Sequence, residues 1–341
     1  MRFFCTYFDR NYLSRGLALL RSLERHAGDI TLFVLCMDDA TFDALTSFAR
    51  PSVVPIRLAD LEAHDTELAA IKQSRSKIEY YFTCTPSLPL LIFDRQPEVS
   101  LITYLDADLF FFADPLPLFD ELGGGSVGII SHRFPLRLKD RERYGLYNVG
   151  WLTFRRDDKG LTCLRWWRER CIEWCFDRED AGRFADQKYL DDWPTRFPGV
   201  VVLQHEGANV APWNVEPSKM RVSGDEIFVG NEPLIFFHFH GLKQIGRWVF
   251  DPAWKEYGVE SSALLRRRVY QPYIRSLADV NRRLLQSSSR SSIPDGVRFG
   301  NTASNAQSPA RKIVASLRRT RNMMRELAAG SLILFVKRFA A

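Results

Sequence analysis

The sequence lacks a long uncharged apolar run. Nowhere do about 18 apolar residues follow one another without a charge, which is roughly the length that a helix needs to cross a bilayer. The first residues, MRFFCTYFDR, reach Asp9 and Arg10 too early to leave room for the apolar segment of a secretory signal. We therefore expect a cytoplasmic protein without a transmembrane helix.

Paired cysteines and a phosphate-loop lysine are also missing. The six cysteines have no CxxC spacing, which argues against a zinc site, and in a reducing compartment we expect them to be buried thiols. The glycine-rich run ELGGGSVG at 121–128 lacks the lysine that completes a phosphate-binding loop. We interpret that run as a turn.

Apart from these absences, the amino-acid composition is typical of a globular protein. Of the 341 residues, 46% are hydrophobic and 26% are charged, which suits one large domain with an extension. The formal net charge is +6, and much of the positive charge lies near the C-terminus without a nucleic-acid-binding signature. Nucleic acid is therefore not an expected partner.

Strand patterns alternate with helical patterns from the N-terminus onward. We expect strands at 2–8, 30–38, 53–58, 101–105, 127–134, 148–154, 200–204 and 233–241. We expect helices at 13–26, 39–48, 71–84, 163–176 and 184–193. Because several strands are almost continuously apolar, they predict an α/β, Rossmann-like fold with a mostly parallel sheet covered by helices on both faces.

The composition changes after about residue 258. We predict a main domain at 1–258, a helix with a Ser-rich linker at 259–308, and a basic amphipathic helix at 309–341. Such a C-terminal helix could lie on an anionic membrane surface, here the inner face of the membrane. Its apolar side could equally pack on the main domain or on a second subunit, and the sequence leaves both alternatives open.

The stretch LITYLDADLFFFADP at 101–115 places two carboxylates at the end of an apolar strand. An ionised carboxylate is costly to bury without a partner. In parallel sheets ligands bind beyond the carboxyl ends of the strands, and in extended backbone Asp106 and Asp108 would point the same way. Their oxygens suit Mg²⁺ or Mn²⁺, so the stretch predicts a metal site. The alternative is that both aspartates only cap the segment that follows.

Five short motifs, in this order, resemble the nucleotide-sugar-dependent glycosyltransferases of the GT-A fold, in particular family 8-like members related to glycogenin and lipopolysaccharide galactosyltransferase. The resemblance covers about residues 2–252 and rests on TYFDRNYLSRGLALLRSL, YLDADLFFFADPLPLF, YNVGWLTF, FADQKYLDDW and HFHGLK. It implies a GT-A fold, Mn²⁺ or Mg²⁺, and a nucleoside-diphosphate-sugar donor, foremost a UDP-sugar. It also implies transfer to a hydroxyl of a glycan or lipid-linked acceptor with retention of anomeric configuration, as in surface polysaccharide synthesis.

The same resemblance implies a metal-binding set. Asp106 and Asp108 match the two metal-binding carboxylates of the family, and Asp106 would also approach the ribose of the donor. His238 matches the third ligand. His240, two residues further along the predicted strand, would lie on the same face and remains an alternative. An imidazole nitrogen suits Mn²⁺ better than Mg²⁺. Lys243 would touch the diphosphate, but it stands one residue closer to Gly241 than in the usual motif.

The resemblance also assigns residues to the two ends of the donor. Three residues near the N-terminus would bind the nucleotide: Thr6, Asp9 and Asn11. A basic residue in SRSKIEYYF would point toward the donor, and both Arg75 and Lys77 qualify. Three residues would surround the transferred sugar: Asn148, Asp186 and Gln187. Asp186 could stabilise positive charge at the anomeric carbon or orient the acceptor, while the two amides would bind hydroxyls.

Plainer roles and other functions remain possible for some of these residues. Asn148 could close a turn before Gly150, and Gln187 could lie on a surface helix. A phosphatase with an aspartate nucleophile also carries DxD after an apolar strand, although Leu109 and Phe110 follow here where Thr or Val is usual. A non-catalytic, membrane-associated protein that binds nucleotide sugars is a further alternative, against which the full set of acidic and histidine residues argues.

Overall fold

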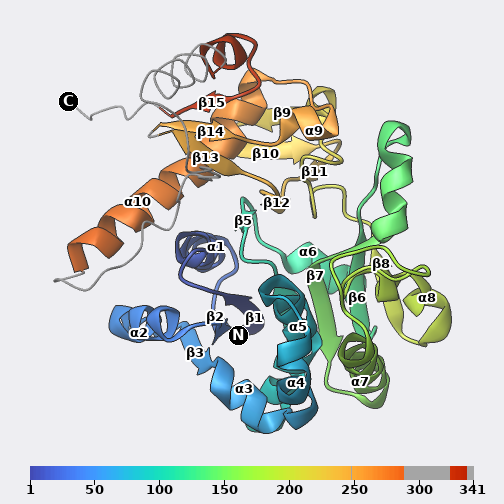
Figure 1. The fold of residues 1–341 in the computed structure, drawn as a ribbon. Helices are drawn as coiled ribbons and strands as arrows, with labels where there is room; N and C mark the ends of the chain where they lie inside the picture. The colour runs from blue at the N-terminus through green and yellow to red at the C-terminus, as the bar shows by residue number, and fades with distance from the viewer. Residues whose placement is uncertain (247, 288–322, 336–341) are drawn as a thin grey trace, which may run out of the picture.

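The computed structural model describes residues 1–246, 248–287 and 323–335 (Figure 1). The main sheet contains β1 (Arg2–Phe8), β2 (Ile30–Cys36), β3 (Val53–Arg57), β4 (Leu101–Leu105), β6 (Val127–Ser131), β7 (Tyr147–Arg155) and β8 (Val200–Leu203). The helices include α1 (Leu13–His26), α2 (Asp39–Phe48), α3 (Leu58–His64), α4 (Thr66–Ile71), α5 (Lys77–Arg95), α6 (Leu116–Leu122), α7 (Asp158–Glu173), α8 (Trp193–Arg196), α9 (Trp254–Tyr257) and α10 (Gln271–Ser287). Shorter strands are β5 (Leu109–Phe111), β9 (Met220–Ser223), β10 (Glu226–Val229), β11 (Glu232–Pro233), β12 (Phe236–His238), β13 (Lys243–Gly246), β14 (Val249–Asp251) and β15 (Ile333–Leu334).

Seven strands of the described chain form the main sheet, in the order β3-β2-β1-β4-β7-β6-β8. The ladders joining β3, β2, β1 and β4 are parallel, as is the ladder between β6 and β8. Only β7 runs against its neighbours, β4 and β6. The predicted mostly parallel α/β sheet is therefore confirmed.

Local signals in the sequence account for where several helices begin. Asp38 caps α2 by accepting a hydrogen bond from the backbone N–H of Thr41, and Asp157 caps α7 through Gly160. Ser76 and Glu79 form a reciprocal capping box at the start of α5. These polar side chains satisfy backbone N–H groups that the first turn of a helix leaves without partners.

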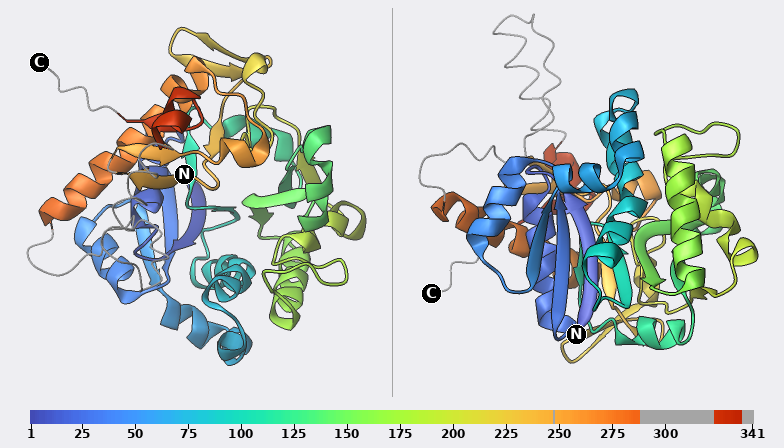
Figure 2. Two further views of the ribbon diagram at one scale, coloured as in Figure 1. Left: turned by 45° about the horizontal axis from the view of Figure 1, so that its top comes forward. Right: turned by 90° about the horizontal axis from the view of Figure 1, so that it is seen from below.

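Helices cover both faces of the sheet, as the views in Figure 2 show. One hydrophobic core packs α5 and α7 against one face, with Leu88 and Trp167 fully buried. The other core packs α1, α6 and α10 against the opposite face, around Trp151. Both faces of the central strands are therefore removed from water, which explains why these strands are apolar throughout.

Helix α5 is longer than its sequence pattern predicts. The expected helix at 71–84 ends before Pro86, because proline removes a backbone donor and clashes with the preceding turn. In the structure α5 begins at Lys77 and continues through Pro86 and Pro89 to Arg95. Its second half is buried between the sheet and α7, so tertiary packing outweighs the local cost of two prolines.

The C-terminal part adds smaller sheets and α10 to this frame (Figure 1). Val280 and Leu284 of α10 belong to the same core as α1, so the packed domain continues past the boundary predicted at residue 258. Residues 288–322, which include the predicted linker and the start of the tail, lie outside the described part of the chain. None of the helices described here is both long and apolar enough to cross a membrane.

The described end of the tail differs from the predicted single helix over 309–341. A helix at 323–328 stops before Gly330, whose φ of +72° lies in the left-handed region. Strand β15 follows and pairs with β14, which buries Ile333 and Phe335 in a third core. The prediction of a helix is thus wrong at 333–334, and for these residues packing on the main domain is the alternative that holds.

Candidate active site

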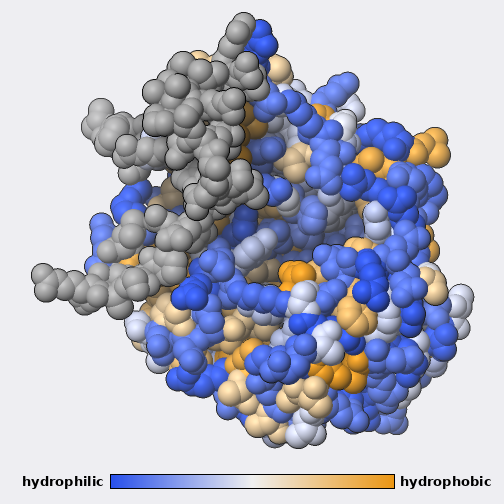
Figure 3. Space-filling view, viewed as in Figure 1, coloured by the Kyte–Doolittle hydropathy of each residue, from blue (hydrophilic) through white to orange (hydrophobic). Residues whose placement is uncertain are grey.

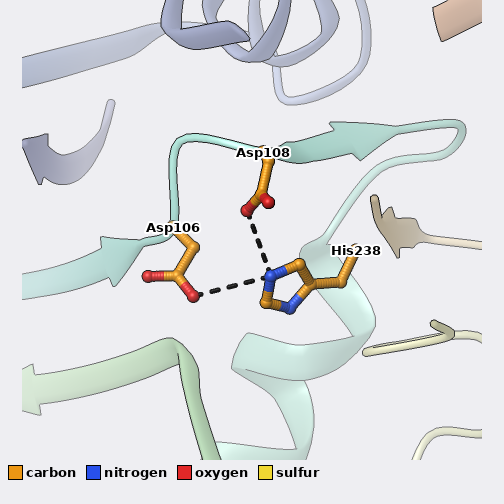
Figure 4. Close-up of side chains that lie close together, drawn as sticks. All are labelled: Asp106, Asp108 and His238. Atoms are coloured by element: carbon orange, nitrogen blue, oxygen red, sulfur yellow. Dashed lines mark ion pairs between the residues drawn. The ribbon is translucent and has the colours of Figure 1, made fainter. Parts of the chain in front are cut away.

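Asp106, Asp108 and His238 converge on one point (Figure 4). The Nε2 atom of His238 lies 3.1 Å from Oδ1 of Asp108 and 3.6 Å from Oδ2 of Asp106. One ligand atom from each residue lies within 4.8 Å of the others, the only such group of acidic, histidine or cysteine side chains in the described part of the chain. His240 does not belong to it, so His238 is the histidine that faces the carboxylates.

Two strands bring these distant residues together. After β4 the chain turns at Asp106, whose carbonyl accepts a hydrogen bond from the backbone N–H of Leu109, and then enters β5. Strand β5 pairs antiparallel with β12, and Leu109 lies opposite His238. Both carboxylates face the imidazole although the backbone between them turns and is not extended as predicted.

The electrostatics of the three groups are strongly coupled. Burial raises the pKa of Asp106, His238 opposes this rise, and the charge of Asp108 adds to it. Burial also acts to raise the pKa of Asp108, but His238 and Arg15 outweigh it and lower that pKa. The pKa of His238 is raised, because the two carboxylates outweigh the opposite effect of burial. Two partly buried carboxylates this close together are therefore stabilised by positive charge between them.

The donor set fits a divalent metal ion. Carboxylate oxygens and one imidazole nitrogen are ligands for Mn²⁺ and related ions. The Tyr104 hydroxyl donates a hydrogen bond of 3.0 Å to Oδ1 of Asp106, which orients that carboxylate and leaves Oδ2 toward His238. Backbone hydrogen bonds hold the two aspartates in place. Asp106 N–H donates to the Gly150 carbonyl, and the Asp108 carbonyl accepts from Phe239 N–H. The cluster is thus a preorganised candidate metal site.

Two cavities meet at this cluster. One has a volume of about 480 Å³ and is lined by Asp9, Asn11, Tyr12, Lys77 and Tyr81 besides the three cluster residues. The other has a volume of about 340 Å³ and shares Asp106 and His238 with the first. Its further lining includes Asn148, Asp186, Gln187, His132 and Trp213. The face of the molecule in Figure 3 is hollowed near its centre, with hydrophilic residues predominating around the hollow.

The larger cavity, called here the nucleotide-side cavity, contains Asp9, Asn11 and Lys77 of the predicted nucleotide-binding residues. The Lys77 ammonium lies 2.7 Å from Oδ2 of Asp9, and the backbone N–H of Asn11 donates to Oδ1 at 2.9 Å. Burial acts to raise the pKa of Asp9, but these contacts lower it. Arg75 points elsewhere, because its guanidinium donates to the Ile172 carbonyl near the end of α7 and stacks on Phe176.

Thr6 lines neither cavity. It is fully buried in β1, where side chains alternate between the two faces of the sheet. The adjacent Tyr7 lines both cavities, whereas Thr6 lies on the other face of the strand, as does Phe4, which packs in the core around Trp151. The Thr6 hydroxyl is therefore not placed to bind a nucleotide.

The smaller cavity, called here the sugar-side cavity, contains all three predicted sugar-binding residues. Asn148 donates from Nδ2 to Oε1 of Gln187 at 3.4 Å, and Gln187 donates from Nε2 to the Tyr144 carbonyl at 3.2 Å. Asp186 is only 4% exposed, and burial raises its pKa to about 7, with the charge of Asp106 adding to the effect. Gln187 precedes a short 3-10 turn at Lys188–Asp192, so it does not lie on a surface helix.

Lys243 does not reach the cluster. It is exposed at the start of β13 and lines neither cavity. A basic residue that the motifs did not identify lies closer: Arg15 stacks over Tyr12 with 4.3 Å between the guanidinium carbon and the ring centre, and its charge acts on Asp108. Its position one helical turn after the tyrosine of the first motif was the available signal. His132 and Trp213 lie outside every motif, so no pattern in the sequence indicates them.

Comparisons with known proteins place this chain beside two bacterial relatives. It is 31% identical over 277 residues to YfnD of Bacillus subtilis (strain 168), covering 80% of this chain and 88% of YfnD, and 33% identical over 248 residues to YfnF of the same strain, covering 70% and 81%. Both relatives are described as uncharacterized. The solved structure of the galactosyltransferase LgtC with donor and acceptor sugar analogues has a TM-score of 0.48 and 19% identity, covering 70% of this chain and 87% of LgtC. No protein-family model matches the chain.

Proposed function

This chain belongs to the same family as YfnD and YfnF of Bacillus subtilis, and we propose that it is a metal-dependent glycosyltransferase acting on a nucleoside-diphosphate sugar. One observation carries the proposal: Asp106, Asp108 and His238 converge where the nucleotide-side and sugar-side cavities meet. A nucleoside diphosphate linked to a sugar has two uncharged ends, the nucleoside and the sugar, and a doubly charged centre. This order matches the order of the nucleotide-side cavity, the candidate metal site and the sugar-side cavity.

The residues of the cluster would hold the metal through one carboxylate oxygen each and the Nε2 atom of His238. A divalent ion at this point would stabilise the negative charge that develops on the diphosphate as the sugar–phosphate bond breaks. The imidazole favours Mn²⁺ over Mg²⁺. A UDP-sugar is the donor that the motif resemblance supports, and retention of configuration rests on the same resemblance.

The nucleotide-side cavity would bind the nucleoside. Its walls combine aromatic rings, among them Tyr12 and Tyr81, with the charged pair of Asp9 and Lys77. An aromatic ring offers a stacking surface to a base. Lys77 is the basic residue for the donor in this proposal, because Arg75 is held by the end of α7.

The sugar-side cavity would hold the transferred sugar. Asn148 and Gln187 place amide groups on its wall, and sugar hydroxyls both donate and accept hydrogen bonds. Asp186 lies on the same wall, where its ionised form would stabilise positive charge at the anomeric carbon. A site built to pair hydroxyls rejects sugars that lack them.

Thermal shift with nucleotide sugars tests the proposal. Binding stabilises the folded chain by mass action, so UDP-glucose or UDP-galactose together with Mn²⁺ should raise the melting temperature more than either component alone. A panel that also contains nucleotide sugars with other bases would identify the donor. Absence of any metal-dependent shift across the panel would overturn the proposal, and release of phosphate from simple phosphate esters would favour the phosphatase alternative.

The acceptor and the cellular location belong to the same proposal. We place the enzyme in glycan or polysaccharide synthesis in the cytoplasm, with a glycan or lipid-linked acceptor. The predicted membrane contact depends on the tail at 309–341, of which residues 309–322 and 336–341 lie outside the described chain. Sedimentation of the full chain with anionic lipid vesicles would test that contact.

A further inference from the structure

The side-chain amide of Asn148 has only one possible orientation. The backbone N–H of Gly150 can only donate, and it lies 3.0 Å from Oδ1 of Asn148, so that atom is the oxygen. The contact is tight, because a Cβ atom added at Gly150 would lie 2.5 Å from Oδ1 of Asn148 and 3.0 Å from Nδ1 of His238. The amide nitrogen therefore has to point the other way.

That nitrogen meets His132. Nδ2 of Asn148 lies 3.2 Å from Nε2 of His132, and because an amide nitrogen only donates, the imidazole nitrogen has to accept. An acceptor at Nε2 carries no proton. Burial lowers the pKa of His132 to about 3, so the ring is neutral at physiological pH, with its single proton on Nδ1.

The packing around His132 fixes its ring. The imidazole stacks on Phe134, with 4.7 Å between ring centres and planes within 10°, and Trp213 meets it edge-on at 5.2 Å. The backbone on both sides is held as well, since His132 N–H donates to the Leu146 carbonyl and its own carbonyl accepts from Asn214. The position of Nε2 is thus set before any ligand enters.

We propose that His132 is a positioning residue, which accepts a hydrogen bond at Nε2 and thereby holds the amides of Asn148 and Gln187 in one orientation on the wall of the sugar-side cavity. The inference rests on the proposed function for the identity of the ligand, a nucleoside-diphosphate sugar. His132 acts through Asn148 and need not touch the sugar. Its removal would leave the metal cluster and the nucleotide-side cavity in place.

The hydrogen bond to His132 therefore defines which atoms on the wall of the sugar-side cavity donate hydrogen bonds and which accept them. Both amide hydrogens of Asn148 are used, one on His132 and one on Oε1 of Gln187, so toward the sugar Asn148 can only accept. Gln187 donates one hydrogen to the Tyr144 carbonyl and keeps the other. A sugar hydroxyl facing Asn148 therefore has to donate. If the amide of Asn148 were rotated by 180°, its nitrogen would face the sugar as a donor, and the hydrogen bond from the sugar hydroxyl would be lost.

A matched pair of variants separates this role from simple packing. His132→Gln keeps an acceptor oxygen near the place of Nε2, whereas His132→Leu keeps a similar volume without any acceptor. Titration calorimetry with Mn²⁺ compares UDP alone with UDP-glucose and UDP-galactose. We expect the Leu variant to bind the preferred nucleotide sugar about tenfold more weakly, with its UDP affinity unchanged, because one buried hydrogen bond is lost.

The Gln variant should stay within about threefold of the original chain for both ligands. Equal binding by the Leu variant, or an equal loss for UDP and nucleotide sugar, would overturn the role. The same split is expected in the kinetic constants, where the Leu variant raises the KM for the donor and leaves product inhibition by UDP as it was.

A second readout needs neither metal nor donor. Long-range ¹H–¹⁵N spectra of the full chain labelled at its six histidines report which ring nitrogen carries the proton, and the His132 signal is identified by its loss in His132→Gln. We expect Nδ1 protonated and Nε2 bare. A proton on Nε2 would refute the inference, even if the Leu variant does not fold. If no nucleotide sugar binds the original chain, the proposed function fails while the tautomer still decides the role of His132.

Discussion

His238 and Asp108, distant in the sequence, face each other with 3.1 Å between Nε2 and Oδ1. Their meeting depends on the short antiparallel ladder of β5 and β12, in which Leu109 lies opposite His238. A shift of one residue in that register would turn His238 to the other side of its strand. The candidate metal site therefore depends on the pairing of β5 with β12, and not only on the aspartates at the end of β4.

The first prediction concerns Asp108→Asn. The change keeps the shape of the side chain but removes one negative charge from the candidate metal site. Replacing a partner of a metal ligand already costs roughly 10–100-fold in affinity. We expect the loss of a ligand to be at least as large, measured by Mn²⁺ titration and by the metal-dependent thermal shift with nucleotide sugars.

Asp120→Asn is the control for that substitution, because Asp120 is an exposed aspartate on α6. It should bind Mn²⁺ and nucleotide sugars as the original chain does. The Asp108→Asn chain should stay folded, because the amide keeps the shape of the side chain and Asp106 remains beside His238. Undiminished Mn²⁺ affinity in Asp108→Asn would remove Asp108 from the metal site.

The second prediction distinguishes Lys77 from Arg75. Lys77 is paired with Asp9 in the nucleotide-side cavity, so Lys77→Met should weaken binding of UDP with Mn²⁺ by about tenfold. Arg75 binds the carbonyl of Ile172, so Arg75→Met should lower the melting temperature and leave UDP affinity unchanged. Weaker UDP binding in Arg75→Met, together with unchanged UDP binding in Lys77→Met, would make Arg75 the donor residue instead.

The sequence predicts some elements of the fold and the site well and leaves others undecided. The periodicity of apolar residues and the continuous apolar runs predict β1, α1, β2 and the DxD strand closely, because each element carries its own signal in consecutive residues. The choice between Arg75 and Lys77 was open, because both stand beside the start of one helix. Only the position of the end of α7, far along the chain, decides which of them is free for the cavity.

The same reason explains the residues that the motifs assigned wrongly or omitted. Lys243 stands in the expected motif, but pairing of β13 with β14 holds it at the surface. Trp213 and His132 come from a loop and a strand end that no local pattern distinguishes, and they meet only after the sheet has formed. Local sequence therefore indicates which chemistry is present, whereas long-range packing decides which side chains share a cavity.

The third prediction is a pH dependence caused by Asp186. Its pKa of about 7 lies above the ordinary value of about 4, because the carboxyl is buried. A carboxyl that binds its proton more tightly in the folded chain makes the free energy of unfolding fall as pH rises from about 4 to about 7. The upper limit is roughly 4 kcal/mol, from about three pKa units at about 1.4 kcal/mol each.

Asp186→Asn cannot titrate, so its stability should fall less over that window and should exceed that of the original chain at about pH 8. Urea denaturation at about pH 5 and about pH 8 measures the difference. Asp192→Asn, at a surface aspartate paired with Arg196, serves as the control and should follow the original chain. Parallel curves for Asp186→Asn and the original chain would show that Asp186 is ionised throughout.

The fourth prediction concerns a buried ion pair far from the cavities. Arg168 of α7 donates to both carboxylate oxygens of Asp65, and Ser87 donates to the same carboxylate. Arg168→Met would leave the buried Asp65 charge without its main partner, which costs roughly 3–5 kcal/mol. Arg170→Met, on the same helix but in an exposed pair with Glu173, should cost less than about 1 kcal/mol. Equal losses in urea denaturation would contradict the buried character of the first pair.

The fifth prediction concerns the tail and uses two neighbouring residues of β15. Ile333 is 1% exposed and packs in the third core beside Phe250, whereas Leu334 is 48% exposed. Ile333→Ala should therefore lower the free energy of unfolding by roughly 2–5 kcal/mol, because it opens a cavity in a packed core. Leu334→Ala should change it by less than about 0.5 kcal/mol.

A tail inserted in a membrane surface would give a different result. Both residues would then contribute apolar area to the lipid, so both substitutions would weaken sedimentation with anionic vesicles, and neither would affect unfolding in the absence of lipid. Packing on the main domain predicts the opposite, since the core loses Ile333 whether or not vesicles are present. The Ile333 and Leu334 pair therefore distinguishes a tail that completes the domain from one that anchors it, using the full chain and without truncation.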